Sequence, residues 1–550
     1  MTVFWMGWLV SSAVLFQTDG SWFTRQAVVS VCPIGSRVGA NVLRAGGNAV
    51  DAAVATAFAL AVTHPAAGNI GGGGFMLVAG GPDREPEVID YREVAPAAAT
   101  ARMFQAGESG RTHRAVGVPG TVAGLALAHR RHGTVSWPSL VQPAIILARD
   151  GFAIDAALAQ SLNGQLKESS NESEFRRVYG KPGGGFWKSG DRLILSDLAG
   201  SLESIAKHGE DGFYRGRVAE ALVSEMKRGG GILTHDDLKQ YRAIVRDPVR
   251  INFRGHEILA LPPPSSGGVC LSLMSGMFEE TGLGKHPRDS AVALHLMAES
   301  MRRAFRERAR HLGDPAFTAN PTHLVDPLFA RQLGRTIDSA KATPSAALAG
   351  DIEMVNEKEH TTHFSVIDKW GRAVSNTYTL EDSYGSRIVV GNAGFLLNNE
   401  MQDFNWFPGR TDTLGRIGTP ANQVAPGKRM LSSQCPVIVR KNGAVVGITG
   451  SPGGRTIPST VAQIVANKLV WNMPIDQAVS FPRLHHGWFP DELRFEKADD
   501  PAWANVVADL RRRGHKVVHQ VQGDAHSLWR EGELWHAGID NRIAGGASGD

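Results

Sequence analysis

The chain has 550 residues, enough for several domains or one very large core, and its 42% hydrophobic and 20% charged residues are typical of a soluble globular protein. Its 58 basic and 54 acidic residues give a formal net charge of +4, and the absence of a dense Lys/Arg run argues against nucleic-acid binding. Its three cysteines (Cys32, Cys270 and Cys435) form no CxxC pair, which excludes a zinc ribbon or thioredoxin-like motif and argues against a disulfide framework.

The chain starts with an apolar stretch at residues 3–16, which is too short, and too interrupted by serines, for a transmembrane helix. It resembles the core of a signal peptide, but the first positively charged side chain is Arg25 and no A-x-A cleavage site follows. Residues 1–26 are therefore interpreted as a signal, an anchor or a disordered start, and these alternatives stay open.

Residues 36–63 predict two helices separated by a Gly-Gly break, with Asn48 as the cap of the second. The second helix is rich in alanine and has little polarity, so we expect it to be buried on most sides. A glycine run at 71–74 then precedes a buried strand at 75–78. A dinucleotide-binding loop has the opposite order, a strand before the glycines and a helix after them, so this run is interpreted as close backbone packing.

Helical patterns dominate the chain up to about residue 350, and short strands bounded by Gly, Asn and Asp turns dominate after residue 361. The expected helices are at 121–131, 137–149, 295–312, 460–470 and 503–513. The expected strands are at 88–90, 361–367, 373–380, 388–390, 437–439 and 445–448. This order predicts an α/β protein of stacked layers rather than alternating βαβ units.

The most informative segment is a predicted β-hairpin, in which strands 361–367 and 373–380 flank a turn at 368–371. If the turn centres on Trp370, opposed residues have numbers that sum to 740, and Thr361 lies opposite Thr379. Opposed Cβ atoms in an antiparallel pair are about 4.5–5.5 Å apart, so the Thr379 hydroxyl could reach Thr361. An ordinary structural pair of threonines has the same spacing, and spacing alone favours that alternative.

Several motifs along the chain, taken together, resemble the γ-glutamyltranspeptidase family. The run TTHFSV at 361–366, followed by NTYTL at 376–380, is similar to the start of that family's small subunit. The other matches come in the family's order: 46–53, 71–78, 91–93, 117–121, 262–268, 312–315, 397–401 with 403–404, 431–433, 450–454 and 523–527. Each motif alone has little specificity, but the ordered set is highly specific and covers the chain from about residue 27.

The resemblance implies an N-terminal nucleophile hydrolase with a four-layer αββα sandwich. It also implies self-cleavage of the bond between His360 and Thr361, which gives a large subunit of residues 27–360 and a small subunit of residues 361–550 that form one intertwined domain. The freed α-amino group of Thr361, with an ordinary pKa near 7.7–8.0, suits the role of base for its own hydroxyl. Before cleavage that nitrogen is an amide and cannot act as a base.

The resemblance also assigns the remaining site residues. Thr379 corresponds to the threonine that hydrogen-bonds the nucleophile, and Gly453 and Gly454 correspond to the oxyanion hole, although without the resemblance a tight turn after Pro452 would be the favoured explanation of these glycines. The implied substrate-binding residues are Arg92, Ser432 and Ser433 for the carboxylate of a γ-glutamyl group, and Glu400 and Asp403 for its ammonium, with Glu381 as an additional carboxylate where many relatives have Asn. A lid over the site is expected between Asp403 and Ser432, with Leu414 in the place of the family's aromatic lid residue.

The implied reaction transfers a γ-glutamyl group from glutathione or a conjugate to water or to an amino-acid or peptide acceptor, and no metal or organic cofactor is implied. An acylase acting on glutaryl groups or poly-γ-glutamate, and a non-catalytic family member, are the alternatives. A serine or zinc hydrolase is not favoured because the chain has no G-x-S-x-G and no H-E-x-x-H motif, and His363 is interpreted as a structural strand residue. The family resemblance favours a periplasmic or extracellular location, whereas the weak N-terminal signal leaves a cytoplasmic one open.

Overall fold

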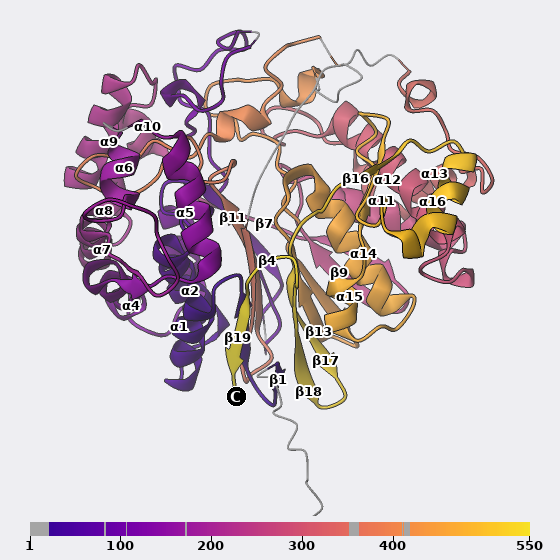
Figure 1. Cartoon of the computed structure of the whole chain (residues 1–550), viewed down its shortest axis with the longest axis horizontal. Coiled ribbons are helices and arrows are strands. Elements are labelled where there is room, and N and C mark those ends of the chain that lie inside the picture. The colour runs from indigo at the N-terminus through magenta and orange to yellow at the C-terminus, as the bar shows by residue number, and fades with distance from the viewer. Residues whose placement is uncertain are drawn as a thin grey trace, which may run out of the picture.

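The computed structural model describes residues 21–550 apart from 82–83, 106, 171–172, 351–361, 410 and 412–417. Two antiparallel sheets of seven strands each lie at the centre of the molecule (Figure 1). In spatial order, sheet A consists of β1 (Trp22–Phe23), β18 (Leu534–Ile539), β17 (His526–Glu531), β13 (Ala444–Thr449), β12 (Val437–Lys441), β9 (His256–Ala260) and β8 (Val249–Phe253). Sheet B consists of β19 (Gly546–Gly549), β2 (Ala27–Ser30), β10 (Thr362–Ile367), β11 (Ala373–Thr379), β3 (Gly73–Ala79), β4 (Glu87–Asp90) and β7 (Ile244–Arg246).

Two groups of helices flank the sheets, one on each side in Figure 1. The group beside sheet B consists of α1 (Pro33–Arg44), α2 (Ala49–Thr63), α3 (Thr121–His132), α4 (Trp137–Asp150), α5 (Ala156–Glu168), α6 (Glu174–Tyr179), α7 (Ser196–His208), α8 (Asp211–Tyr214), α9 (Gly216–Arg228) and α10 (His235–Gln240). The group beside sheet A consists of α11 (Gly267–Glu280), α12 (Ala291–His311), α13 (Pro327–Arg335), α14 (Ile457–Leu469), α15 (Ile475–Ser480) and α16 (Ala504–Arg512). Small accessory sheets are formed by β5 (Phe152–Ala153) with β6 (Arg192–Leu193), and by β14 (Leu484–His485), β15 (Leu493–Phe495) and β16 (Val517–His519).

Three buried apolar cores separate the four layers. The middle core joins the two sheets, with Phe75 and Leu77 of β3 facing Ile438 and Ile448 of sheet A. The opposite face of sheet B packs on the first helical group, and the opposite face of sheet A packs on the second. Since each sheet buries both faces, the chain is an αββα sandwich, and the predicted fold class is confirmed.

The helix predicted after the Gly-Gly break is α2, and all of its residues are buried. Asn48 caps it as predicted, with its side chain accepting from the backbone N–H groups of Val50 and Asp51, while Asp51 accepts from the N–H of Asn48. The predicted helix at 460–470 forms as α14 but begins earlier, at Ile457, because Pro458 is compatible with a first turn.

Two expectations from the sequence are wrong in detail. Residues 388–390 do not form a strand: Val389 makes only an isolated bridge to Leu396, and the left-handed backbone of Arg387 (φ 61°) and Asn392 (φ 59°) ends the extended segment on both sides. The start of the folded body lies before residue 27, because β1 pairs with β18 at the edge of sheet A. Residues 3–16 lie outside the described part of the chain.

Both sheets contain strands from before and from after residue 361. In sheet B, β10 lies between β2 and β11, and β11 pairs in turn with β3. In sheet A, β12 lies between β9 and β13. Neither half of the chain therefore contains a complete sheet. Among the described residues, no helix is long and apolar enough to cross a membrane.

Candidate functional site

The site is built around the predicted hairpin. Strands β10 and β11 pair with Thr362 opposite Tyr378 and His363 opposite Thr377, so opposed numbers sum to 740 as predicted. Thr361 and His360 lie outside the described residues, and the approach of Thr361 to Thr379 stays a prediction. Thr379 is the last residue of β11, and its Oγ1 accepts a hydrogen bond of 2.8 Å from the backbone N–H of Glu381.

His363 lies buried between the sheets, with Nδ1 2.9 Å from Thr377 Oγ1 and Nε2 3.1 Å from Ser365 Oγ. Burial lowers its pKa to about 3, helped by His526, so the ring is neutral at physiological pH. Both ring nitrogens already have partners within the sheet. This environment agrees with the structural role expected from the sequence.

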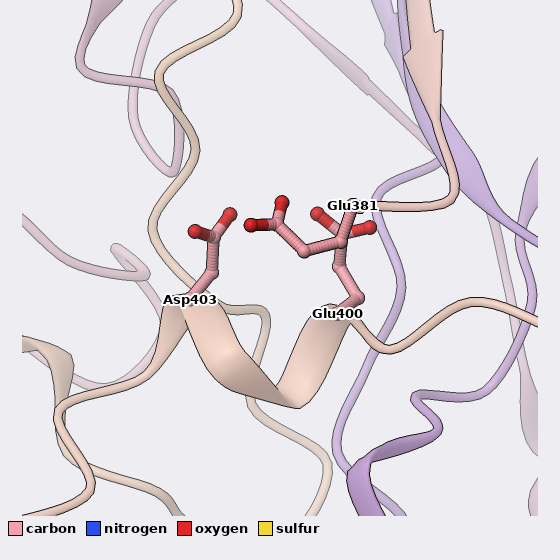
Figure 2. A group of neighbouring side chains, drawn as sticks. All are labelled: Glu381, Glu400 and Asp403. Atoms are coloured by element: carbon pink, nitrogen blue, oxygen red, sulfur yellow. The ribbon is translucent and has the colours of Figure 1, made fainter. Parts of the chain in front are cut away.

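Three buried carboxylates meet at the end of β11 (Figure 2). Glu400 and Asp403 begin and end the short 3₁₀ helix η5 (Glu400–Asp403), and Glu381 lies in the loop that follows β11, where its backbone is left-handed (φ 78°). One oxygen of each carboxylate lies within 4.8 Å of the other two, and in Figure 2 all three groups point into the same space. The three-residue spacing of Glu400 and Asp403 thus produces the shared reach that the sequence suggested, and the group can hold a cation.

Arg92 supplies the positive charge facing these carboxylates. It follows strand β4, is 1% exposed, and its guanidinium makes hydrogen-bonded ion pairs to both Glu400 and Asp403. Glu93 lies 3.8 Å from the same guanidinium. Burial raises the pKa of Glu93 to about 7 and that of Glu400 well above its ordinary value, while Arg92 acts in the opposite direction on both.

The structure brings together Arg92, Glu381, Glu400 and Asp403, but it pairs the arginine with the two carboxylates assigned to an ammonium. The separate roles expected from the sequence therefore require an exchange of partners when a zwitterionic ligand binds. The ligand's carboxylate would pair with the Arg92 guanidinium. The ligand's ammonium would then take the place of this guanidinium beside Glu400 and Asp403.

The predicted serines, Ser432 and Ser433, lie in the segment that precedes β12. Arg92 Nε donates to the backbone oxygen of Met430 at 3.4 Å, which ties this segment to the arginine. Ser432 bonds through its backbone to the loop before α11, donating to Pro264 at 2.8 Å. Ser433 Oγ accepts from Arg308 of α12 at 3.0 Å. Arg308 is buried and was missed in the sequence, where a basic residue in a predicted helix carries no sign of a buried role.

Gly453 and Gly454 form the turn between β13 and α14, at the start of the 3₁₀ helix η7 (Gly454–Thr456). Both have positive φ, 120° and 55°, and a Cβ on Gly453 would lie 2.6 Å from Thr456 Oγ1. Consecutive backbone N–H groups at the start of a helical turn suit a developing oxyanion. The positive φ values suit a tight turn, and the role of the two glycines as an oxyanion hole stays a prediction.

The sequence model of the family described as Gamma-glutamyltranspeptidase matches residues 35–550. The chain belongs to this family. The glutathione hydrolase proenzyme of Escherichia coli (strain K12) is 42% identical over 534 residues, covering 94% of this chain and 91% of the relative, and that of Pseudomonas aeruginosa is 39% identical over 547 residues, covering 97% and 95%. As a family member, the chain is an enzyme of the γ-glutamyltransferase class.

Solved structures support the same conclusion. The γ-glutamyltranspeptidase of Helicobacter pylori is 38% identical with a TM-score of 0.55, and the match covers 57% of this chain and 92% of that one. A cephalosporin acylase from Bacillus halodurans has a TM-score of 0.84 over 99% of both chains, but at 22% identity it shows the fold alone. The N-terminal nucleophile hydrolase fold implied by the sequence is thereby confirmed.

The family resemblance predicts a lid between Asp403 and Ser432. Leu414 lies outside the described residues, so only the two ends of this segment can be described. At these ends, Trp406 stacks on Phe104 with ring centroids 3.8 Å apart, and the N–H of Gly409 donates to the backbone oxygen of Gly418 at 2.9 Å. The two ends of the segment are therefore held close together. Its function as a lid stays a prediction.

Substitution of Gly453 by alanine should lower kcat for γ-glutamyl amides by about 10²–10³-fold, the usual cost of one lost oxyanion donor, with little change in KM. Gly453 has a positive φ, and a new Cβ would come too close to Thr456, so alanine would shift the turn and its backbone N–H groups. Gly443→Ala is the matched control, because Gly443 has φ 81° in the β12–β13 turn and open space around a Cβ. Steady-state kinetics of both variants tests this, and an equal loss in Gly443→Ala would contradict it.

Proposed function

We propose that this chain is a precursor that cleaves itself between His360 and Thr361, and that the new N-terminal threonine transfers γ-glutamyl groups from glutathione or its conjugates to water or to an amino-acid or peptide acceptor. The observation that carries the proposal is the meeting of Arg92 with Glu381, Glu400 and Asp403 at the end of β11. This is the strand beside which Thr361 would enter sheet B.

Cleavage at this position is compatible with an intact fold. Fragments 27–360 and 361–550 would share both sheets, since strands of each fragment pair with strands of the other. The two subunits should therefore stay together without a covalent link. The E. coli and P. aeruginosa relatives are themselves described as proenzymes.

In the proposed reaction, the free amine of Thr361 takes the proton of its own hydroxyl, and Oγ attacks the γ-carbonyl carbon of the substrate. The N–H groups of Gly453 and Gly454 stabilise the oxyanion that forms. The intermediate collapses to a γ-glutamyl ester of Thr361, and the leaving amine departs with the proton. Attack on the ester by water or by an acceptor amine restores the threonine.

A γ-glutamyl group has both a carboxylate and an ammonium at its far end, and the buried cluster matches this pair. Arg92 would hold the carboxylate with help from Ser432 and Ser433. Glu400 and Asp403 would hold the ammonium, and Glu381 adds a further negative charge. The alternative acylase activity fits this cluster less well, because a glutaryl group has no ammonium and would leave the carboxylates without the cation they need.

A direct test compares two anilides that differ only in the ammonium, γ-glutamyl-p-nitroanilide and glutaryl-p-nitroanilide. We expect kcat/KM to be at least about 10²-fold higher for the γ-glutamyl compound, because a site of buried polar groups strongly rejects an analogue that leaves them unpaired. Equal or inverted preference would support the acylase alternative. Cleaved protein that turns over neither compound would support the non-catalytic one.

A periplasmic or extracellular location belongs to the same proposal and rests only on membership of the family. Fractionation of cells expressing the full chain, with N-terminal sequencing of the large fragment, tests it. Activity confined to the cytoplasm would contradict it.

A further inference from the structure

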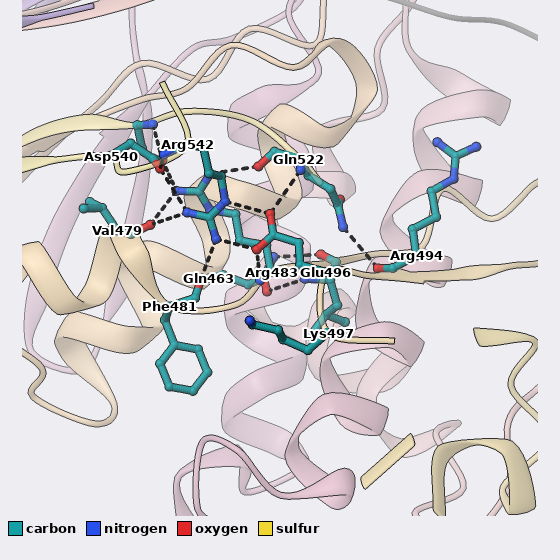
Figure 3. A network of polar contacts seen from close by, with 12 residues as sticks. Gln463, Val479, Phe481, Arg483, Arg494, Glu496, Lys497, Gln522, Asp540 and Arg542 are labelled. Atoms are coloured by element: carbon teal, nitrogen blue, oxygen red, sulfur yellow. Dashed lines mark hydrogen bonds and ion pairs between the residues drawn. The ribbon is translucent and has the colours of Figure 1, made fainter. Parts of the chain in front are cut away.

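The buried arginines of the described residues differ in how their charge is balanced. Most of them make an ion pair with a buried carboxylate: Arg92, Arg302, Arg303 and Arg483. Figure 3 shows the pair of Arg483 with Asp540, inside a wider network that contains Arg542 and Glu496. Arg308 is 4% exposed and makes no such ion pair within the part of the chain that the structure describes. A buried cation without a counter-ion is costly, so its position favours an anion nearby.

The polar partners of Arg308 are neutral. It lies in the last turn of α12, where Nε donates to Ser266 Oγ and Nη2 donates to Ser433 Oγ, both at 3.0 Å. Hydroxyl oxygens satisfy these N–H groups, but they carry no charge that would balance the guanidinium. Arg288 is another buried arginine without an ion pair among the described residues, and its guanidinium lies over the ring of Phe481, 4.5 Å from the centroid. Arg308 has no aromatic contact of this kind with any described residue, so its charge depends on what binds beside it.

The contacts of Arg308 also fix the segment that carries the two predicted serines. Ser266 donates to the backbone oxygen of Ser432 twice, from Oγ and from its backbone N–H, both at 2.8 Å. The guanidinium therefore holds the backbone of Ser432 through Ser266 and the side chain of Ser433 directly. Both predicted serines are buried. Their positions are thus set by contacts with α12 and with the start of α11.

The direction of this hydrogen bond determines what Ser433 can bind. A guanidinium can only donate, so the Ser433 hydroxyl accepts from Arg308 and must direct its own proton elsewhere. No acceptor for that proton is found among the described residues. A hydrogen bond from a cation polarises a hydroxyl and strengthens its donation to a further acceptor. A carboxylate would accept this proton and would bring negative charge toward Arg308.

The same short segment contacts the other guanidinium of the site. The backbone oxygen of Met430 accepts from Arg92 Nε at 3.4 Å, and Ser433 accepts from Arg308 three residues further along. Three residues span at most about 10 Å, even when fully extended. Two buried positive charges therefore act on one small region, where a low dielectric constant strengthens their attraction for an anion.

We propose that Arg308 is a positioning residue for the substrate carboxylate. It holds Ser433 so that the hydroxyl donates to the carboxylate that Arg92 binds, and its buried charge strengthens this hydrogen bond. Arg308 itself does not need to touch the substrate. The inference rests on the proposed function, in which Arg92, Ser432 and Ser433 bind the carboxylate of the γ-glutamyl group. Arg308 thereby becomes a determinant of specificity for acyl groups that carry a carboxylate beside the ammonium.

The first test measures substrate discrimination within one protein. Each variant is given γ-glutamyl-p-nitroanilide and 4-aminobutyryl-p-nitroanilide, which differ only in the carboxylate, and the ratio of the two kcat/KM values is determined. Wild type should prefer the γ-glutamyl compound. This ratio should fall about tenfold in Arg308→Met, because the carboxylate loses the support of one charge-assisted hydrogen bond. Both substrates report on the same folded fraction, so the ratio does not depend on how much of the variant folds.

Arg288→Met is the matched control and should keep the wild-type ratio, because Arg288 is equally buried but bonds to Asn467 and Gln463 of α14. Ser433→Ala should lower the ratio as Arg308→Met does. The double variant should lower it no further than the larger single effect, since the arginine acts through the serine. An unchanged ratio in Arg308→Met, or two effects that multiply, would overturn the proposal. A wild-type ratio near one would instead count against the proposed function.

A conservative variant separates the charge of the side chain from its packing. Arg308→Lys keeps the positive charge but replaces the two nitrogens that reach Ser266 and Ser433 by a single ammonium. It should therefore keep a higher ratio than Arg308→Met. Equal ratios in these two variants would show that the charge does not reach the substrate, and would overturn the proposal.

The second test does not depend on catalysis. L-Glutamate and 4-aminobutyrate differ only in the carboxylate beside the amino group, and calorimetric titration gives the Kd of each for wild type and for Arg308→Met. The Kd of glutamate should rise about tenfold in Arg308→Met, and that of 4-aminobutyrate should rise much less. An equal rise for both ligands would show that Arg308 only supports the fold of the site, and would overturn its role in positioning.

Discussion

Replacing Thr361 by alanine should leave the chain uncut at 550 residues and should remove γ-glutamyl transfer. In the proposed mechanism, Thr361 supplies both the hydroxyl that attacks and, after cleavage, the amine that accepts its proton. Loss of a nucleophile of this kind lowers kcat by about 10⁴–10⁶-fold. A denaturing gel and N-terminal sequencing check the first expectation, because wild type should give a fragment of 190 residues that begins Thr-Thr-His-Phe.

The neighbouring threonine offers a matched control. Thr362 is 1% exposed, and its Oγ1 has no hydrogen-bond partner among the described residues, so Thr362→Val removes a hydroxyl of the same kind one residue away without breaking a contact. This variant should still cleave and remain active. Thr361→Ser keeps both functional groups and should cleave as well. A Thr361→Ala protein that still yields a fragment starting at residue 361 would rule out this threonine as the nucleophile of self-cleavage.

The hairpin that follows Thr361 was predictable because its register is set locally. Asp368 Oδ1 accepts from the backbone N–H groups of Trp370 and Arg372, both at 2.9 Å, and Gly371 takes the left-handed φ of 79° that closes the turn. All of this lies within five residues. The cap of α2 by Asn48 is local in the same way. Alternation and turn residues therefore determined which residues of β10 and β11 face each other.

The carboxylate cluster could not be derived in this way. Arg92 is about 300 residues from Glu400 and Asp403 in the sequence, and no periodicity connects them. The family resemblance indicated which residues belong to the site, but it did not reveal that they pair with one another. Arg308 and the network around Arg483 were missed because a buried arginine looks like a surface arginine until its partners are known. The prediction of a strand at 388–390 was wrong because the sequence gives no strong sign that Arg387 and Asn392, on either side of it, have a left-handed backbone.

The second large effect is expected on substitution of Arg92, which pairs with Glu400 and Asp403. Arg92→Met should lower kcat/KM for γ-glutamyl amides by at least about 10³-fold, because in the proposed complex it removes the bidentate partner of the substrate carboxylate. It should also lower the free energy of unfolding by about 3–5 kcal/mol, since Glu93, Glu400 and Asp403 would lose their shared counter-charge in a buried site. Denaturant unfolding measured beside steady-state kinetics separates the two effects.

Two further variants show whether charge is the cause. In Arg92→Met with Glu400→Gln, removal of one unpaired carboxylate should restore part of the lost stability but none of the activity. Arg92→Lys keeps the charge and should retain most of the stability, yet a single ammonium cannot reach Glu400 and Asp403 with separate nitrogens as the guanidinium does. Its KM should therefore rise more than its kcat falls. If the double variant is no more stable than Arg92→Met, buried charge is not what makes Arg92 structurally important, and its role reduces to packing and substrate contact.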